Sequence, residues 1–278
     1  MSPYSRSTRV AFLGPVGTYS HTAVLVYFGD SVTLLDCPTI DDVFHSVDSG
    51  AAQFGVVPVE NSTEGAINNT LDCLVDTTLK IRGEVIVPVE HNLMYLDGTD
   101  PAKIIKIVSH KQSLAQCRKW LTANHAGVEQ TEVASNAEAA RIAAREKNVA
   151  AIAGSMAAGL YGLKIGASGI QDQKNNSTRF LILATRYPEP SGGDKTSTLI
   201  YAENRPGALF RILEPFERYQ VSLTRIETRP SRKAMWDYVF FVDFEGHVDD
   251  QPVRHVLERL KDCTAEVKLL GSYPMAAK

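Results

Sequence analysis

A polar loop runs directly into an apolar strand between residues 175 and 183, and the residues at this junction are the first candidates for chemistry. Residues 181–183 are consecutive apolar side chains, which predicts a central strand buried on both faces. Thr178, Arg179 and Phe180 precede them and would lie at the mouth of the covered sheet. A hydroxyl and a guanidinium in that position can bind an anion, although a hydroxyl at the start of a strand also serves as a turn partner.

A glycine loop near the N-terminus offers a second candidate site. Residues 9–13 are expected to form a strand, and residues 14–20 (Gly-Pro-Val-Gly-Thr-Tyr-Ser) follow it at the start of a helical pattern. The unpaired N–H groups of a helix end, together with the hydroxyls of Thr18 and Ser20, would suit a carboxylate or a phosphate. The spacing matches neither glycine motif for nucleotides, and a turn with a helix N-cap is the structural alternative.

A third polar loop, residues 58–65 (Pro-Val-Glu-Asn-Ser-Thr-Glu-Gly), ends the strand expected at residues 54–59. It gathers a carboxylate, an amide and two hydroxyls before a helix expected at residues 69–75. So many polar groups at the tip of an apolar strand favour the wall of a ligand site, whereas Ser62 or Thr63 could instead form a capping box.

The elements between these loops alternate between strand and helix, which predicts an α/β fold. The further strands are expected at residues 32–35, 104–108, 128–133 and 149–153, and the further helices at residues 39–50, 112–123 and 135–147. The pattern restarts after residues 91–95, which indicates two similar lobes, and residues 175–183 return the chain to the first lobe. Ligand sites in such folds lie in the cleft between the lobes, at the carboxyl ends of strands.

A Pro/Gly/Ser-rich linker at residues 187–194 precedes a different pattern. The strands are then expected at residues 196–202, 221–228, 237–244 and 265–270, and the helices at residues 207–218 and 252–261. This βαββαβ order predicts a small split-βαβ domain. Its first loop, residues 203–209, either lets a ligand approach a helix N-terminus or is a structural turn. The linker predicts that the part before it can fold and work without the part after it.

The composition is that of an ordinary soluble protein with two or three compact units, since 44% of its 278 residues are hydrophobic. No apolar run is long enough to span a membrane and no signal peptide is evident, so we expect a cytoplasmic protein without membrane contact. Four widely spaced cysteines are expected to be reduced thiols. With 29 basic against 32 acidic residues, the chain lacks the positive excess that nucleic acid binding needs.

Taken together and in this order, the three loops resemble those of the prephenate dehydratases, and the resemblance covers essentially the whole chain. The matching segments are residues 14–20, residues 58–65, Thr-Arg-Phe-Leu at residues 178–181 and, in a part that looks like the family's ACT domain, Gly-Ala-Leu at residues 207–209 and Glu-Thr-Arg-Pro at residues 227–230. Thr228 stands where the family usually has Ser, which keeps the hydroxyl. Lys111-Gln112 stands where the family has Pro-Gln after the matching His, so His110 is expected to be a supporting residue only.

The resemblance implies a two-lobed, periplasmic-binding-protein-like (type II) catalytic domain at residues 8–187 and a ferredoxin-like βαββαβ ACT domain at residues 195–274. It implies a carbon–oxygen lyase of phenylalanine biosynthesis that converts prephenate to phenylpyruvate, uses neither metal nor cofactor, and is inhibited by L-phenylalanine. A homodimer or homotetramer is expected, without the family's fused chorismate mutase, because so few residues precede the first strand. Arogenate dehydratase and a non-catalytic amino-acid-sensing protein are the alternatives.

By resemblance, Thr178 is the proton donor, and a threonine would act through a hydrogen bond that strengthens as the leaving oxygen gains charge. Consecutive strand residues point to opposite faces. Arg179 therefore either clamps a substrate carboxylate or supports the site from behind, and Phe180 shares the face of Thr178. The expected substrate-binding residues are Gly17, Thr18, Tyr19, Ser20, Glu60, Asn61, Ser62 and His110.

The effector site is expected in the ACT domain. A phenylalanine presents an ammonium, a carboxylate and a benzyl group, so we expect two loops that meet across a subunit boundary. The helix N-terminus would hold the carboxylate, and Glu227 would hold the ammonium or pair with Arg205 or Arg229. The expected residues are Asn204, Arg205, Pro206, Gly207, Ala208, Leu209, Glu227, Thr228, Arg229 and Pro230.

Overall fold

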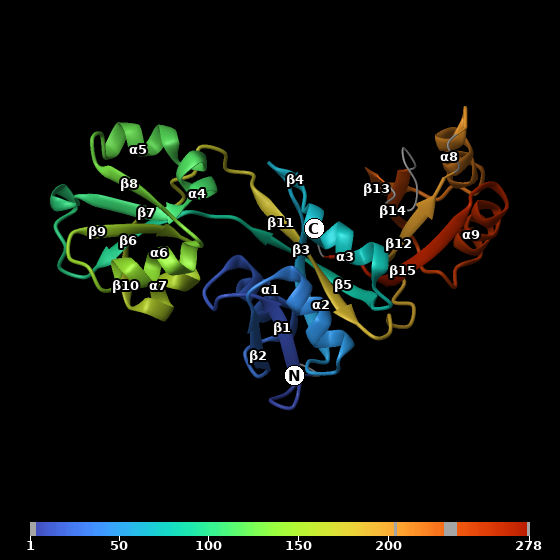
Figure 1. Ribbon diagram of the computed structural model, residues 1–278, viewed down its shortest axis with the longest axis horizontal. Helices are drawn as coiled ribbons and strands as arrows, with labels where there is room; N and C mark the ends of the chain where they lie inside the picture. Colours follow the sequence, from blue (N-terminus) through green and yellow to red (C-terminus); the bar gives the residue numbers. More distant parts are fainter. Residues whose placement is uncertain (1–3, 203–204, 231–237, 277–278) are drawn as a thin grey trace.

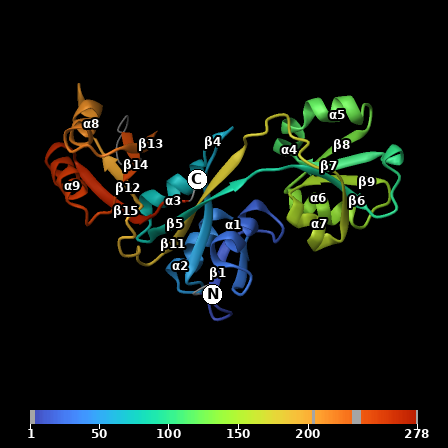
Figure 2. The same ribbon diagram turned by 180° about the vertical axis from the view of Figure 1, so that it is seen from behind.

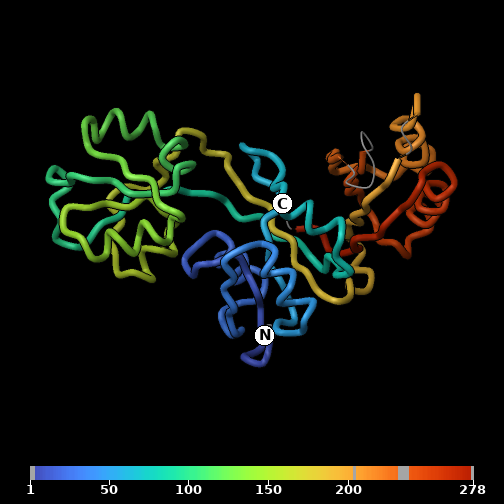
Figure 3. The backbone as a smooth tube through the Cα atoms, in the orientation of Figure 1, coloured from blue at the N-terminus to red at the C-terminus, as the bar shows by residue number. Residues whose placement is uncertain are grey.

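The computed structural model describes residues 4–202, 205–230 and 238–276. Its three bodies lie in a row, and Figure 1 and Figure 2 show the same order from opposite sides. Lobe 1 (residues 4–88 and 177–187) is in the middle, lobe 2 (residues 92–167) is at one end, and the C-terminal domain (residues 194–276) is at the other. The chain crosses between the lobes twice, at residues 89–91 and 168–176 (Figure 3).

Lobe 1 is built on a mixed sheet of order β2-β1-β3-β11-β5, with β4 paired to β3. The strands are β1 (Arg9–Leu13), β2 (Thr33–Cys37), β3 (Phe54–Asn61), β4 (Gly65–Ala66), β5 (Lys80–Pro88) and β11 (Ser177–Ala184). The helices are α1 (Tyr19–Phe28), α2 (Ile40–Asp48) and α3 (Asn68–Asp76). Strand β11 runs antiparallel to both β3 and β5, so its first residues lie beside the carboxyl end of β3.

Strand β11 is buried on both faces, which confirms the prediction from its apolar residues. Phe180 and Ile182 pack on one face with side chains of α1. Leu181 and Leu183 pack on the other face with side chains of α2 and α3. This alternation directs Thr178 to the same face as Phe180, and it directs Arg179 to the opposite face.

Lobe 2 contains a second sheet, of order β10-β6-β9-β7-β8. The strands are β6 (Asn92–Leu96), β7 (Lys106–His110), β8 (Glu129–Val133), β9 (Val149–Ala153) and β10 (Leu163–Ala167). The helices are α4 (Lys111–Gln116), α5 (Arg118–Asn124), α6 (Asn136–Ala143) and α7 (Ser155–Tyr161), with a short 3₁₀ helix at Pro101–Lys103.

Lobe 2 differs from the sequence-based expectation in three places. Strand β6 occupies residues 92–96, although the second lobe is expected to begin only after residues 91–95. The single helix expected at residues 112–123 is interrupted at Cys117, which is fully buried and has non-helical dihedrals (φ −109°, ψ 12°). Strand β10 is not among the expected strands, although Leu163, Ile165 and Ala167 alternate with Lys164 and Gly166 and their burial alternates in the same way, because the pattern is only five residues long and includes a glycine. At Cys117 tertiary packing, rather than local periodicity, sets the structure.

The C-terminal domain is an antiparallel sheet of order β13-β14-β12-β15 with two helices packed on one face. Its elements are β12 (Asp194–Tyr201), α8 (Ala208–Arg218), β13 (Leu223–Pro230), β14 (Tyr238–Glu245), α9 (Gln251–Cys263) and β15 (Glu266–Pro274). This is the βαββαβ order predicted from the sequence, and the fold prediction is confirmed.

The C-terminal domain packs on lobe 1 through a shared hydrophobic core. Val57 and Leu181 of lobe 1 lie in the same buried cluster as Phe241 of the C-terminal domain. At Gly271 the backbone of β15 approaches that of β5 so closely that a Cβ atom would collide with the main chain of Ile81. A side chain at this position would therefore separate the two domains.

The segment that joins lobe 1 to the C-terminal domain is itself held in place. The buried carboxylate of Asp194 accepts hydrogen bonds from the hydroxyl of Ser191 at 2.6 Å and from the N–H of Gly192 at 3.0 Å. A ring nitrogen of His247 lies 3.2 Å from the carbonyl oxygen of Pro188. The Pro/Gly/Ser composition of this segment therefore does not make it a free tether.

Three features bear on the chemistry open to the protein. All four cysteines are free thiols. In the described ranges, no group of three or more His, Cys, Asp or Glu side chains is arranged to hold a metal ion. None of the helices formed by those residues has the length and apolar character of a membrane span.

Candidate functional site

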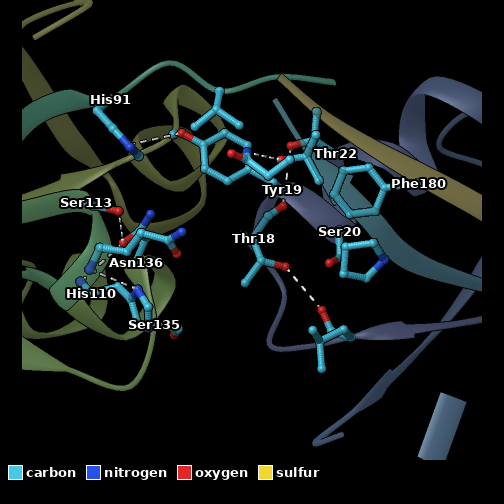
Figure 4. Close-up of a pocket in the computed structure, with 18 of the residues that line it drawn as sticks. Thr18, Tyr19, Ser20, Thr22, His91, His110, Ser113, Ser135, Asn136 and Phe180 are labelled. Carbon is cyan, nitrogen blue, oxygen red and sulfur yellow. Dashed lines mark hydrogen bonds between the residues drawn. The ribbon is translucent and has the colours of Figure 1, made fainter. Parts of the chain in front are cut away.

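A cavity of about 430 Å³ lies between the two lobes, on the face of β11 that carries Thr178. Lobe 1 contributes the loop before α1, the end of β3 and the start of β11, and lobe 2 contributes the N-terminal ends of α4, α6 and α7 (Figure 4). The main polar residues of the lining are Thr18, Tyr19, Ser20, Asn61, Glu64, His91, His110, Ser113, Gln116, Ser135, Asn136, Asn176 and Thr178.

Asn61 orients the hydroxyl of Thr178. The backbone N–H groups of Thr63 and Glu64 lie 3.0 and 3.2 Å from Oδ1 of Asn61. Because a backbone N–H can only donate, this atom must be the amide oxygen, and the Nδ2 group faces β11. Nδ2 donates to Oγ1 of Thr178 at 2.9 Å. The hydroxyl oxygen accepts this bond, so its own proton is available to a molecule in the cavity.

Asn136 is held in a similar way on the opposite wall. Its Oδ1 accepts hydrogen bonds from the backbone N–H of His110 at 3.2 Å and from the hydroxyls of Ser109 and Ser113, each at 3.0 Å. The backbone donor again identifies this atom as the amide oxygen. The NH₂ group of Asn136 is therefore the part left for a ligand, and each wall of the cleft presents an oriented amide.

Several helices begin at the cavity. Thr18 caps α1, His110 caps α4 and Ser135 caps α6, each through a side-chain hydrogen bond to a helix N–H. The N-terminal ends of helices carry partial positive charge. Among the described residues that line the cavity, none is a lysine or an arginine. The site is therefore suited to an anion held by neutral donors and helix dipoles.

Gln116 connects the two lobes beside the two segments, residues 89–91 and 168–176, in which the chain crosses between them. Its Oε1 accepts a hydrogen bond from Asn176 at 3.2 Å and lies 2.8 Å from Nε2 of His91, while its Nε2 donates to Glu64 at 3.0 Å. Burial lowers the pKa of His91, and the hydrogen bond to Gln116 only partly offsets this, so the ring is neutral. Burial raises the pKa of Tyr19, whose hydroxyl donates a hydrogen bond to the backbone carbonyl of Glu90 at 2.6 Å. These contacts join both lobes and both crossing segments.

Arg179 lies outside the cavity, on the other face of β11. Its Nε donates to Glu84 at 2.7 Å and its Nη2 donates to the hydroxyl of Tyr273 at 3.1 Å. Its Nη1 lies 2.7 Å from Oδ2 of Asp243. Asp243 and Tyr273 belong to the C-terminal domain. Of the two roles expected for Arg179, this geometry favours support from behind the site over direct contact with a substrate carboxylate.

The cavity brings together most of the expected site residues, namely Gly17, Thr18, Tyr19, Ser20, Asn61, His110, Thr178 and Phe180. Glu60 and Ser62 do not line it. Glu60 precedes Asn61 in β3 and points to the opposite face, where it lies 3.2 Å from Arg225. Ser62 binds the loop before β11 instead, donating to the carbonyl of Asn175 at 3.2 Å and accepting from the N–H of Ser177 at 2.9 Å.

Gln116 and Asn136 line the cavity but do not stand out in the sequence, whereas Asn176, which also lines it, lies in the polar loop that the sequence marks as a candidate site. Gln116 lies within an expected helix. Asn136 lies in the sequence Ser-Asn-Ala-Glu at residues 135–138, a capping-box pattern at the start of an expected helix, and this structural role is sufficient to explain it. One signal was present: the capping box directly follows β8, and the ends of strands are where the other polar loops gather. The side chain of Gln116 gives no such signal, because it reaches the cleft only through the packing of α4.

A second cavity, of about 290 Å³, lies at the start of α8 in the C-terminal domain. Its lining includes the expected effector residues Arg205, Gly207, Ala208 and Leu209, together with Phe210, Tyr238 and Phe240. Gly207 has φ 76°, a left-handed conformation that favours glycine. Pro206 lies in the same loop, and Asn204 lies outside the described residues. Residues 227–230 lie on β13 and do not line this cavity, and Arg229 instead binds Asp72 of lobe 1 at 2.8 Å.

Both parts of the chain match known protein families. Residues 10–188 match the family model of prephenate dehydratase, and residues 196–262 match that of the ACT domain. A bifunctional chorismate mutase/prephenate dehydratase of Stutzerimonas stutzeri is 51% identical over 268 residues, which are 96% of this chain and 73% of that protein. A prephenate dehydratase of Methanocaldococcus jannaschii is 37% identical over 275 residues, covering 96% of this chain and 98% of that protein.

A solved structure shows the same arrangement. The prephenate dehydratase of Arthrobacter aurescens in complex with L-Phe has a TM-score of 0.88 and 32% sequence identity, and the match covers 96% of this chain and 90% of that one. The similarity thus extends over both lobes and the C-terminal domain. The chain belongs to the prephenate dehydratase family, and it is a lyase with a C-terminal ACT domain.

Proposed function

We propose that the protein catalyses the decarboxylating dehydration of prephenate to phenylpyruvate, and that L-phenylalanine inhibits it by binding to the ACT domain. The observation that carries the first part is the hydroxyl of Thr178. Asn61 fixes its orientation, and its proton is available at a cavity that suits an anion. Prephenate, a dicarboxylate with a hydroxyl leaving group, requires both of these features.

The reaction breaks two bonds that join substituents to the ring. The carbon–carbon bond to the ring carboxylate breaks and releases carbon dioxide, and its electron pair enters the ring. The carbon–oxygen bond to the ring hydroxyl breaks, and the oxygen takes up a proton and leaves as water. Aromatisation supplies the driving force, so the protein needs to place a proton donor, hold the pyruvyl end and keep the reacting carboxylate poorly solvated.

The cavity supplies groups for each of these tasks. Thr178 donates a hydrogen bond to the departing oxygen, and the bond strengthens as that oxygen gains negative charge. The bond that Thr178 accepts from Asn61 polarises the hydroxyl and makes it a better donor. The amide of Asn136 and the N-terminal ends of α1 and α6 hold the carboxylates. Phe180 is buried on the same face and packs beneath the substrate ring.

The test is direct. The purified protein is incubated with prephenate and, separately, with arogenate, and phenylpyruvate is followed by its absorbance while phenylalanine is measured by chromatography. Folded protein that forms no phenylpyruvate would contradict the proposal. Arogenate carries an ammonium group, and Glu64 is the only carboxylate among the described residues that line the cavity. If arogenate were the preferred substrate, Glu64→Gln would therefore lower its turnover more than that of prephenate.

Two observations support an effector site for phenylalanine at the start of α8. The cavity there combines apolar side chains, which suit a benzyl group, with backbone N–H groups ahead of a helix, which suit a carboxylate. Phe210 is 72% exposed and Ile226 is 44% exposed, so apolar surface remains uncovered in a single chain. We expect a homodimer in which residues 227–230 of a second copy complete the site and Glu227 meets the ammonium.

Calorimetric titration with phenylalanine tests this assignment. Gly207→Val should abolish binding, but its left-handed backbone would also strain the loop. Phe210→Ser is therefore the second variant, and we expect it to weaken binding by about tenfold or more through loss of apolar contact. Ile105→Ser, at a residue of lobe 2 that is 66% exposed, is the matched control. Unchanged affinity in both loop variants would contradict the site, and sedimentation would show whether the protein is a dimer.

A further inference from the structure

The strand that presents Thr178 to the cleft carries a buried ion cluster on its other face. The cluster consists of Arg179 and Glu84 of lobe 1 and Lys195 and Asp243 of the ACT domain. Glu84 is 6% exposed and Asp243 is 5% exposed. Lys195 donates to Glu84 at 2.8 Å. Glu60 and Arg225 adjoin the cluster: Glu60 lies 3.7 Å from Arg179 and 3.2 Å from Arg225, whose side chain is 9% exposed. With these two the charges balance, three positive against three negative, so each member depends on the others to offset its loss of hydration.

Arg179 is held from three directions. Glu84 comes from the neighbouring strand β5, Asp243 from β14 and the fully buried Tyr273 from β15. Burial alone would lower the pKa of Arg179, but Asp243, Tyr273 and Glu84 outweigh it and raise the pKa, so the guanidinium stays charged. A planar guanidinium held at all its nitrogens leaves the side chain little freedom.

The position of Arg179 bears directly on that of Thr178, because the two residues are adjacent in β11. The ladder between β11 and β3 is irregular here: Arg179 pairs with Glu60 and Phe180 pairs with Pro58, so the register shifts between them. The extra residue of this bulge, Val59, lies in β3, whereas β11 keeps a regular register with β5 from Ser177 to Ile182. The ladder with β5 fixes the main chain of β11 along one edge, and the side chain of Arg179 anchors it from the face opposite Thr178.

The ACT domain supplies much of this support. The hydroxyl of Ser197 lies 2.6 Å from Oδ1 of Asp243 and 2.6 Å from the hydroxyl of Tyr273, so the two groups that meet Arg179 are also linked to each other. The chain end returns to the same point, since the N–H of Ala276 donates to Glu84 at 3.1 Å. Figure 1 shows the C-terminal end beside lobe 1. The ACT domain thus builds the far side of the pocket that holds Arg179.

We propose that Arg179 is a positioning residue, which sets the place of the Thr178 hydroxyl from behind the strand, and that Asp243 of the ACT domain holds Arg179 for this purpose. The proposal rests on the proton-donor role of Thr178 given above. It gives the ACT domain a part in the basal reaction, separate from any effect of phenylalanine.

A double-mutant cycle in the full-length protein tests the proposal, with prephenate as the substrate. Arg179→Lys keeps the charge but loses the planar fork, and we expect kcat to fall roughly tenfold while KM changes by less than about twofold. In the Thr178→Ala background, the same substitution should cause little further loss, because the hydroxyl that it misplaces is already gone. A role in overall structure alone would lower the residual activity by the same factor in both backgrounds.

Two further variants complete the design. Lys268→Met removes a contact across the same interface, the bond from Lys268 to the carbonyl of Val75 at 2.7 Å, without touching β11. We expect it to leave kcat unchanged. Asp243→Asn should also lower kcat, as Arg179→Lys does, and it tests the proposal even if Arg179→Lys does not fold.

Equal losses in both backgrounds would overturn the proposal, and so would a raised KM with unchanged kcat, since that result would make Arg179 a substrate ligand. A loss of kcat in Lys268→Met as large as that in Asp243→Asn would also overturn it. If Thr178→Ala itself kept wild-type turnover, the assignment of Thr178 as proton donor would fail instead. The two failures are therefore distinguishable.

Discussion

The two polar sites on either side of β11 are built from different groups. The cleft side uses hydroxyls, amides and helix ends, and its described lining contains neither lysine nor arginine. The other side buries five charged groups, Arg225 among them, and the side chain of Arg179 there is only 11% exposed. Neutral donors suit a site that must bind and release a charged molecule in every turnover. Buried ion pairs suit a contact that stays made, because separating them would leave uncompensated charge.

The largest effect is expected on the cleft side, at Thr178. Thr178→Ala removes the proposed proton donor but leaves both walls intact, so kcat should fall by about 100-fold or more with little change in KM. Steady-state kinetics with prephenate are the measurement. Thr178→Ser keeps a hydroxyl and should recover most of the activity. Full turnover by Thr178→Ala would show that the cleft side of β11 does not act through the hydroxyl of Thr178.

The next effect concerns the stability of the charged side. Asp243→Asn should lower the free energy of unfolding by about 2 kcal/mol at neutral pH, through loss of hydrogen bonds to a charged group. Burial alone would raise the pKa of Asp243, but Arg179 and the hydrogen bond from Ser197 lower it overall from its ordinary value of 3.8.

The pH dependence of this effect has a definite sign. A carboxyl group whose pKa is lower in the folded state stabilises the fold above its unfolded pKa, and this contribution is lost as the pH falls through the folded value. Urea unfolding of the wild type and of Asp243→Asn should therefore differ fully near pH 7, and the difference should shrink below about pH 4. A difference that does not change with pH would show that Asp243 does not act through its charge.

A smaller effect on rate is expected at Asn61. Replacing its side-chain NH₂ group by the oxygen of an aspartate turns a hydrogen-bond donor into an acceptor. In Asn61→Asp, the carboxylate would accept the proton of Thr178 and turn it away from the cavity. We expect kcat to fall about tenfold, with a smaller change in KM. The melting temperature serves as the control for folding. Unchanged kcat would show that the amide does not orient the hydroxyl.

The smallest effect is expected where an ion pair is neither buried nor shared between domains. Lys106 and Glu146 lie 2.9 Å apart, with side chains that are 27% and 50% exposed. Lys106→Met should lower the free energy of unfolding by about 0.5 kcal/mol or less and leave kcat unchanged. Urea unfolding at two salt concentrations would check this. A loss as large as that of Asp243→Asn would contradict the importance of burial.

Much of the fold is predictable from local pattern. The strands at residues 9–13 and 149–153 have the predicted bounds, because their apolar runs end abruptly at glycine or polar residues. The loops that reach the cavity are predictable as well, since polar groups at the ends of apolar strands meet at one edge of a sheet. Alternation along β11 separates Thr178 from Arg179. Which face meets lobe 2 depends on tertiary packing, and the sequence contains no local sign of it.

The relation between the domains is the least predictable part. A Pro/Gly/Ser segment predicts that the catalytic part folds alone, and this stays a prediction. The structure weighs against it, because Val57 and Leu181 are covered partly by Phe241 and Leu270 of the ACT domain. In the sequence, these side chains are indistinguishable from the core of either domain, since hydrophobic pattern reports burial and not the partner that provides it.

The path of the chain has a consequence for its synthesis. Asn61 and Thr178 are hydrogen-bonded neighbours although they lie 117 positions apart in the sequence, and all of lobe 2 is made between them. Lobe 2 is one continuous segment, so it can fold as it emerges from the ribosome. During this time the edges of β3 and β5 that later pair with β11 are unpaired. Such edges can pair with other chains, which makes this interval the one most open to aggregation. The strand that closes the sheet also carries Thr178, the proposed proton donor, so we expect the nascent chain to be inactive until its first lobe is complete.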